Sequence, residues 1–208
     1  MFCSSPHRQI VYFVFLFICV CNDAYARNSI LLSFGLHKGG DLIAYHLGSE
    51  ATHSQAGDAT LNAGAGHSFE LGFMFPNHSD AVFNTQFSVG TQSKSIFLVD
   101  GKIQFTRITF DLLETINLGN QVLIGFGGTY HYAPVLECTS PSIVGCGNAI
   151  GFDHSKGLVA QFMINPWKSD DSITSWLVGI RLTRINYYYG DILIRGKNIA
   201  LKASLKVF

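Results

Sequence analysis

The sequence predicts an all-β protein, an eight-stranded antiparallel up-and-down transmembrane β-barrel. Three observations support this fold class. Only 13% of the 208 residues are charged, whereas about 25% is typical of soluble domains. Beyond the N-terminal region, no apolar run approaches the roughly 18 to 20 residues that a membrane-spanning helix needs. Instead, segments of about ten residues alternate between apolar and polar side chains, as the strands of membrane barrels do.

The charge balance narrows the possible functions. Lys and Arg together number 14, and Asp and Glu also number 14, so the formal net charge is zero. Nucleic-acid-binding domains usually carry a basic excess, and disordered chains usually carry a high net charge. We therefore expect a membrane barrel or an exported β-protein, with no nucleic-acid partner.

The N-terminus has the features of a cleaved secretory signal. His7 and Arg8 give a weakly positive start, an apolar run covers residues 10–21, and Ala24-Tyr25-Ala26 supplies small residues for cleavage. The apolar run is too short for a membrane anchor. We expect a signal peptide at residues 1–26 and the barrel at residues 27–208.

The five cysteines divide between these two parts. Cys3, Cys19 and Cys21 belong to the leader. A lipoprotein is the alternative to simple cleavage, but branched residues precede Cys19 and Cys21 where a lipid-attachment site needs a small one. Cys138 and Cys146 remain in the exported chain, close together in a turn-rich stretch. We expect them to form a local disulfide rather than part of a metal site.

The first four predicted strands span residues 30–37, 68–75, 83–90 and 107–112. In each, every second side chain is directed to lipid and the others to the interior. Arg107 is expected to point inward, because an outward Arg at mid-membrane costs about 2 to 4 kcal/mol. In chain order, the lipid-facing sets are Ile30, Leu32, Phe34 and Leu36; Phe69, Leu71, Phe73 and Phe75; Phe83, Thr85, Phe87 and Val89; and Ile108, Phe110 and Leu112.

The last four predicted strands span residues 122–131, 158–165, 176–183 and 199–207. The same alternation defines each of them, with mainly small, polar or charged residues on the interior face. In chain order, the lipid-facing sets are Val122, Ile124, Phe126 and Tyr130; Leu158, Ala160, Phe162 and Ile164; Trp176, Val178, Ile180 and Leu182; and Ile199, Leu201, Ala203, Leu205 and Val207.

The connections alternate in length, as in outer-membrane barrels, which have short periplasmic turns and long extracellular loops. Residues 76–80, 118–120 and 168–171 form the short set, and residues 48–58, 94–101, 133–155 and 190–196 form the long set. An even strand number returns the chain to its starting side. We expect a bacterial outer-membrane protein with both termini in the periplasm. Its C-terminal Phe208 is typical of barrels inserted by the outer-membrane assembly machinery.

The first hairpin contains Gly39-Gly40, which could form a turn and add a ninth strand. An odd count would leave the C-terminus outside. We therefore predict a kink within one long strand, which runs to about Leu47 and pairs with a strand from about Ala59 to Phe75. This hairpin is expected to project above the membrane.

Several short motifs carry a family resemblance over nearly all of the exported chain. They are Gly-Gly-Asp-Leu at 39–42, Ala-Gly-Ala-Gly at 63–66 with Leu-Gly at 71–72, Phe-Thr-Arg-Ile at 105–108 with Asp-Leu-Leu at 111–113, and Gly-Gly-Thr-Tyr-His at 127–131. With these motifs the chain resembles a family of uncharacterised proteobacterial outer-membrane β-barrel proteins, within the OmpA/OmpX/OmpW-like class of small barrels. The resemblance implies the fold and the location but no reaction. The chain departs from the family pattern after Tyr45 and in the loop that holds Cys138 and Cys146.

Charged residues occupy interior positions of several predicted strands. Side chains can just fill the interior of an eight-stranded barrel, and an unpaired charge there would cost several kcal/mol. We therefore predict a lumenal ion network that plugs the barrel. A narrow small-solute channel past these charges is the alternative. The predicted members of the network are Glu70, Arg107, Asp111 and Arg181.

An enzyme that modifies lipid A is a less favoured alternative. His67 and Ser68 are adjacent, but neighbours on a strand face opposite sides. His154 and Ser155 fall in a loop, where such residues usually form turn hydrogen bonds. The histidines lack the short fixed spacing of a metal site. We expect no catalytic residues, no metal and no cofactor.

Three cations continue the lipid-facing sets toward the outer ends of consecutive strands. They are Lys38, Arg184 and Lys197. Lipid A phosphates lie at this level of the outer leaflet, and Lys and Arg form charge-assisted hydrogen bonds with phosphate. Contacts with lipopolysaccharide are the hypothesis here, and simple snorkelling to water is the more usual alternative. The sequence as a whole predicts a monomeric, non-enzymatic barrel that acts through its extracellular loops or in envelope structure.

Overall fold

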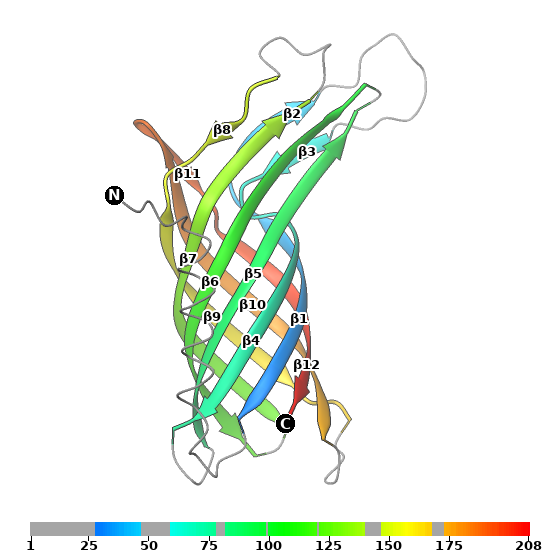
Figure 1. Ribbon diagram of the computed structural model, residues 1–208, viewed down its shortest axis with the longest axis vertical. Helices are drawn as coiled ribbons and strands as arrows, with labels where there is room; N and C mark the ends of the chain where they lie inside the picture. Colours follow the sequence, from blue (N-terminus) through cyan, green and yellow to red (C-terminus); the bar gives the residue numbers. More distant parts are fainter. Residues whose placement is uncertain are drawn as a thin grey trace, which may run out of the picture.

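The computed structural model describes residues 28–46, 59–77, 82–98, 100–119, 121–139, 147–167 and 173–208. Eight long antiparallel strands close into a barrel, as predicted (Figure 1). They are β1 (Ser29–Gly39), β4 (Gly66–Pro76), β5 (Phe83–Phe97), β6 (Lys102–Leu118), β7 (Val122–Cys138), β9 (Ser155–Ile164), β10 (Thr174–Tyr189) and β12 (Asn198–Val207). No helix in the described part of the chain is long and apolar enough to cross a membrane.

The barrel closes where its first strand pairs with its last. Ile30 of β1 lies opposite Val207 of β12 on one side and opposite Phe73 of β4 on the other. The eight predicted segments fall within these strands, except that the sixth runs one residue past the end of β9. Buried and exposed side chains alternate along the strands, as in β1, where Leu31 is buried and Leu32 is exposed. The predicted period of two is therefore confirmed.

Four short strands lie at one end of the barrel, which we call the long-loop end. They are β2 (Leu42–His46), β3 (Ala59–Asn62), β8 (Ile150–Gly151) and β11 (Ile192–Arg195). The chain terminates at the opposite end, which we call the short-turn end (Figure 1). β2 pairs with β3, whereas β8 extends the sheet beside β7, and β11 extends it beside β10.

The first hairpin differs from the predicted continuous strand. Gly39 and Gly40 have φ angles of 122° and 87°, which favour glycine, and they separate β1 from β2. A Cβ on Gly40 would lie 2.2 Å from the backbone nitrogen of Gly64. The hairpin turns inward at this break instead of continuing the wall. This placement buries Leu61 and Ala63 completely inside the barrel mouth.

Two predicted loops are shorter than expected, because the strands continue past their predicted ends, and a third predicted loop contains a short strand. β5 and β6 extend to a tight turn, in which the Leu98 amide donates to the Gly101 carbonyl at 2.8 Å. β7 extends to Cys138, and β10 forms a hairpin with β11. The alternation continues in these extensions, where the side chains of Ile96 and Phe105 are buried.

A β-bulge interrupts the pairing of β6 with β7. Thr106 lies opposite Val135 and Ile108 lies opposite Tyr132. The two residues between Tyr132 and Val135, which are Ala133 and Pro134, therefore face a single residue of β6. Ala133 has a φ of 45°, a conformation that a bulge accommodates. The bulge also permits a proline within the wall, since Pro134 has no amide hydrogen for the ladder.

The interior of the barrel is arranged in three layers. Charged and polar side chains fill the middle, and an apolar cluster lies at each end. The short-turn cluster is Leu31, Met74, Leu123, Met163 and Leu177. The long-loop cluster is Leu61, Ala63, Ile96, Ile103, Phe105, Phe152, Ile185 and Tyr187.

Candidate functional site

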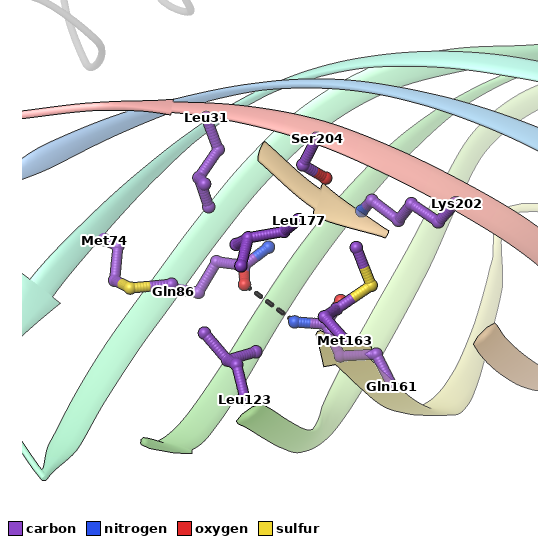
Figure 2. Close-up of a pocket in the computed structure, with 9 residues that line it drawn as sticks. All are labelled: Leu31, Met74, Gln86, Leu123, Gln161, Met163, Leu177, Lys202 and Ser204. Carbon is purple, nitrogen blue, oxygen red and sulfur yellow. Dashed lines mark hydrogen bonds between the residues drawn. The ribbon is translucent and has the colours of Figure 1, made fainter. Parts of the chain in front are cut away.

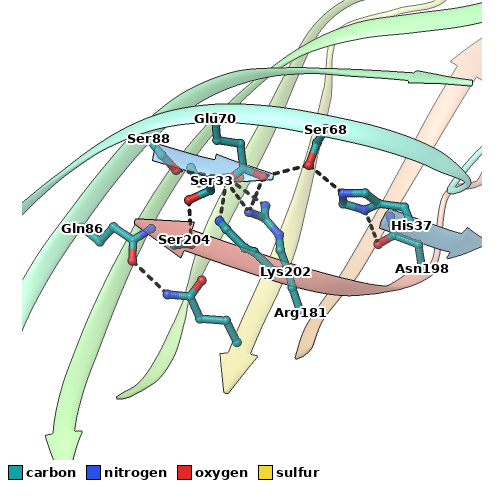
Figure 3. A network of polar contacts seen from close by, with 12 residues as sticks. Ser33, His37, Ser68, Glu70, Gln86, Ser88, Arg181, Asn198, Lys202 and Ser204 are labelled. Carbon is teal, nitrogen blue, oxygen red and sulfur yellow. Dashed lines mark hydrogen bonds and ion pairs between the residues drawn. The ribbon is translucent and has the colours of Figure 1, made fainter. Parts of the chain in front are cut away.

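The polar middle layer is centred on the carboxylate of Glu70 in β4. Arg181 Nη1 of β10 lies 3.2 Å from Glu70 Oε2, and Lys202 Nζ of β12 contacts the same oxygen. Figure 3 shows Arg181 and Lys202 converging on Glu70 from different strands. All three side chains are buried. Both ion pairs join non-adjacent strands, so they cross the lumen rather than run along the wall.

Asp111 of β6 extends this cluster toward another part of the wall. Its Oδ2 lies 2.8 Å from Arg181 Nη2, and it accepts a hydrogen bond from Ser88 Oγ at 3.3 Å. Arg181 therefore bridges two carboxylates. Buried ion pairs are favourable only when charge and geometry are both well matched. Here Arg181 and Lys202 balance the two carboxylates in charge.

The cluster continues toward the long-loop end through neutral side chains. Ser68 Oγ donates to Glu70 Oε1 at 3.3 Å, and His37 Nε2 lies 2.9 Å from Ser68 Oγ. His37 Nδ1 lies 3.2 Å from Asn198 Oδ1 (Figure 3). These contacts connect β1, β4 and β12, so the polar layer extends along the lumen as well as across it.

Arg107 lies apart from this network. Its side chain is 1% exposed, yet none of the described residues forms an ion pair or hydrogen bond with its guanidinium. The guanidinium carbon lies 4.8 Å from the ring centroid of Phe105 and 5.8 Å from that of Tyr187, which are cation–π distances. The structure thus brings together three of the four predicted network residues, sets Arg107 against the long-loop cluster, and adds Lys202.

A buried hydrogen bond beside Arg107 was missed by sequence reasoning. His131 Nδ1 of β7 lies 2.7 Å from Tyr187 Oη of β10. Tyr187 belongs to a run of three tyrosines, whose other two members are exposed. The alternation of side chains could have revealed that Tyr187 faces inward, because it lies an even number of residues after the inward-facing Arg181. The predicted strand, however, ends before this tyrosine.

The lumen is also tightly filled on the short-turn side of the ion pairs. Gln161 Nε2 donates to Gln86 Oε1 at 2.8 Å across the interior. Figure 2 shows this bond beside Met74 and Met163 of the short-turn cluster. These side chains surround a cavity of about 10 Å³, which is room for roughly one water molecule.

The three predicted rim cations lie on the outer surface of the barrel at the long-loop end. Lys38 is in β1, Arg184 is in β10, and Lys197 directly precedes β12. All three side chains are exposed. β10, β12 and β1 are consecutive around the barrel, as predicted. The structure therefore brings these residues to one side of the same rim.

Solved structures of other proteins share this architecture. The attachment invasion locus protein Ail of Yersinia pestis, solved in complex with the heparin analogue sucrose octasulfate, matches with a TM-score of 0.50 at 12% identity, over 86% of this chain and 97% of its own. Neisserial surface protein A (NspA) matches with a TM-score of 0.50 at 10% identity, over 86% of this chain and 96% of its own. No family model and no curated protein sequence match the chain.

The fold is that of a small outer-membrane β-barrel. Ail and NspA belong to this class, which agrees with the broad class in the sequence resemblance. Identities this low carry the fold and nothing finer. Membership of the particular family suggested by the sequence motifs stays a prediction.

The residues considered for catalysis do not form a triad. His67 is exposed and Ser68 is buried, so they face opposite sides of the wall. Ser155 Oγ donates to the Asp153 carbonyl, and His154 Nδ1 accepts from the Ala133 amide. Within the described residues, no group of three or more His, Cys, Asp or Glu side chains is placed to hold a metal ion.

Two predicted features involve residues outside the described ranges. The predicted signal peptide, residues 1–26, is one of them. The predicted disulfide is the other, because Cys146 lies outside the described residues. Cys138 is the last residue of β7, and its carbonyl accepts a hydrogen bond from the Gly147 amide at 3.0 Å. The chain thus returns close to Cys138 one residue after Cys146. Cys138 is disulfide-bonded, and its pairing with Cys146 stays a prediction.

Proposed function

We propose that this protein is a non-enzymatic, monomeric barrel of the bacterial outer membrane, with a closed lumen, that acts through its long-loop surface or in envelope structure. The observation that carries the proposal is the ion network of Glu70, Asp111, Arg181 and Lys202, which crosses the lumen between two apolar clusters. Transport would need an open interior. The packing supports a closed one.

The apolar clusters are the main argument against a channel. An ion entering from either end would lose its hydration shell among leucine, methionine and phenylalanine side chains before reaching a polar group. At the long-loop end, the inward-turned hairpin places Leu61 in one cluster with Phe105. At the short-turn end, the cavity beside Gln86 and Gln161 has room for roughly one water molecule.

The long-loop end is proposed to be extracellular, and both chain ends periplasmic. The unequal connections at the two ends support this orientation, because outer-membrane barrels have short periplasmic turns. Lipids of the outer membrane are then the permanent partners, and the outer-membrane assembly machinery is the transient one. The exposed apolar outer faces of the strands, such as Leu32 and Leu201, support the lipid contact.

Planar-bilayer recording of the refolded mature chain tests the closed lumen. We expect no discrete conductance steps, with insertion verified by fluorescence from dye-labelled protein in the same bilayer. Steps whose ion selectivity changes in Arg181→Met would support the small-solute channel instead. The variant removes a lumenal charge, so a contaminating pore would not respond to it.

A further inference from the structure

The outer surface carries a repeated pattern on four consecutive strands. Each of β9, β10, β12 and β1 has an exposed apolar residue on its outer face. The next outward-facing residue toward the long-loop end is a lysine or an arginine. The apolar residue and its cation are Leu158 and Lys156 on β9, Leu182 and Arg184 on β10, Ile199 and Lys197 at β12, and Leu36 and Lys38 on β1. We call these four cations the rim belt.

The strand register makes two members of the rim belt direct neighbours. Thr183 of β10 lies opposite Asn198 of β12. Because the strands are antiparallel, the next pair toward the long-loop end is Arg184 with Lys197. Lys38 is close to this pair, since its partner in the ladder is Ile199.

Two like charges directly opposite each other destabilise a strand pair. The side chains of Arg184 and Lys197 are both exposed, and neither forms an ion pair or hydrogen bond with any described residue. The carboxylate of Asp41 accepts a hydrogen bond from the Arg195 amide at 2.9 Å and forms no ion pair with either of these described cations. An external anion between the two cations would remove the repulsion.

The other half of the barrel lacks this pattern at the same level. Outward positions toward the long-loop end of β4, β5 and β6 are His67, Ser93 and Thr106, which lie opposite one another in register. On β7, Tyr130 lies opposite Lys156 of β9 and marks the boundary of the belt. At this level, the outward-facing lysines and arginines therefore lie on only one side of the described barrel. A requirement for solubility alone would place them all around it.

We propose that the rim belt binds the phosphate groups of lipid A in the outer leaflet. The proposal rests on the proposed function, because it requires the long-loop end to face outward. The belt directly follows exposed apolar residues of the strand walls, such as Leu36 and Leu182, on the long-loop side. In the proposed orientation this is the side of the outer leaflet, whose lipid A carries the phosphates. Lys and Arg donate charge-assisted hydrogen bonds to phosphate. A free anion has no apolar part, so contact with the adjacent lipid-facing leucines would not stabilise its binding.

The test compares the parent with a variant that carries Lys38→Gln, Lys156→Gln, Arg184→Gln and Lys197→Gln. Thermal unfolding is followed in neutral detergent with and without added lipopolysaccharide. The parent should unfold several degrees higher with lipopolysaccharide, and the variant should lose this shift. A control variant with Lys94→Gln, Lys102→Gln and Arg195→Gln neutralises three long-loop cations outside the belt and should keep the shift.

Two further ligands identify what is recognised. Dephosphorylated lipopolysaccharide should give the parent little or no shift, and inorganic phosphate at the same phosphate concentration should give much less than lipopolysaccharide. An equal shift in the parent and the belt variant would overturn the proposal. So would an equal shift with the dephosphorylated lipid.

A separate measurement distinguishes this proposal from the proposed orientation. Asp191 lies in the exposed turn between β10 and β11. Asp191→Cys should react in intact cells with a maleimide that cannot cross the membrane. Labelling only after permeabilisation would overturn the orientation. Surface labelling together with an unchanged lipopolysaccharide shift in the belt variant would overturn only the belt.

Discussion

On the inner face of the barrel wall, Arg181 and Lys202 are buried and paired with carboxylates; on the outer face, Arg184 and Lys197 are exposed and unpaired within the described chain. Arg181 and Arg184 are three residues apart on the same strand, so strand parity alone separates them. The difference shows that a cation in this fold has a structural role on one face and is available to a ligand on the other.

Arg107 differs from the other inward-facing cations, because it is buried without a carboxylate partner among the described residues. Its guanidinium instead lies beside the rings of Phe105 and Tyr187. The aliphatic part of an arginine can pack like an apolar side chain, and here the whole residue lies at the boundary between the polar layer and the long-loop cluster. Its contribution to stability is therefore packing as well as charge.

The largest expected effect comes from removing the shared carboxylate on the inner face. Glu70→Gln leaves Lys202 without its carboxylate and Arg181 with only Asp111. Breaking a buried ion pair on one side typically costs about 3 to 5 kcal/mol, and we expect a loss of that size in urea-induced unfolding.

The matched control for this variant is Glu114→Gln. Glu114 is an exposed carboxylate on the outer face of β6, where it accepts hydrogen bonds from Asn77 and Thr85. Its replacement should cost no more than about 1 kcal/mol. Equal losses for the two variants would show that the inner network adds nothing beyond a surface contact.

Leucines provide a second comparison of the two faces. Leu61 is 0% exposed in the long-loop cluster, whereas Leu201 is 67% exposed on the outer wall. Leu61→Ala should cost about 2 to 5 kcal/mol, because it leaves a cavity in packed surroundings. Leu201→Ala should cost clearly less in detergent, which adapts to the shorter side chain. The same urea-unfolding measurement applies, and equal losses would contradict the inward placement of the first hairpin.

The sequence determines the eight strands and their two faces because alternation requires only nearest-neighbour information. It also predicts that charges such as Glu70 and Arg181 face the lumen. It does not determine which charges pair, since Arg107 and Arg181 are both inward-facing. The difference comes from depth in the barrel, which depends on strand register across the wall.

The closure of the long-loop end was also beyond sequence reasoning. Leu61 lies in a segment that was predicted to project, and its burial depends on the backbone break at Gly39 and Gly40 and on contacts with distant β6 and β10. The extensions of β5 and β6 carry Ile96 and Phe105 on the inward parity. A longer window on the alternation would have found these strand extensions, but not the hairpin that covers them.

A smaller effect is expected in the coupling between lumenal residues. The cycle of Arg181→Met with Asp111→Asn should give a coupling of about 0.5 to 3 kcal/mol, because the two side chains are in contact. The cycle of Arg107→Met with Asp111→Asn should be additive within about 0.5 kcal/mol. Additivity in this second cycle would contradict the sequence-based prediction that Arg107 and Asp111 share one network. Strong coupling of Arg107 to Asp111 would instead restore that prediction.

The smallest expected effect, with the opposite sign, is on the outer face. Arg184→Gln removes one of two cations that lie directly opposite each other, so its repulsion with Lys197 disappears. Stability in neutral detergent at low salt should be unchanged or rise by less than about 0.5 kcal/mol. Any gain should vanish at about 1 M salt, where the screening length is about 3 Å. Arg184→Lys keeps the charge and should show no gain. A loss as large as that of Glu70→Gln would mean that Arg184 is part of the wall's own packing, and the distinction between the two faces would no longer hold.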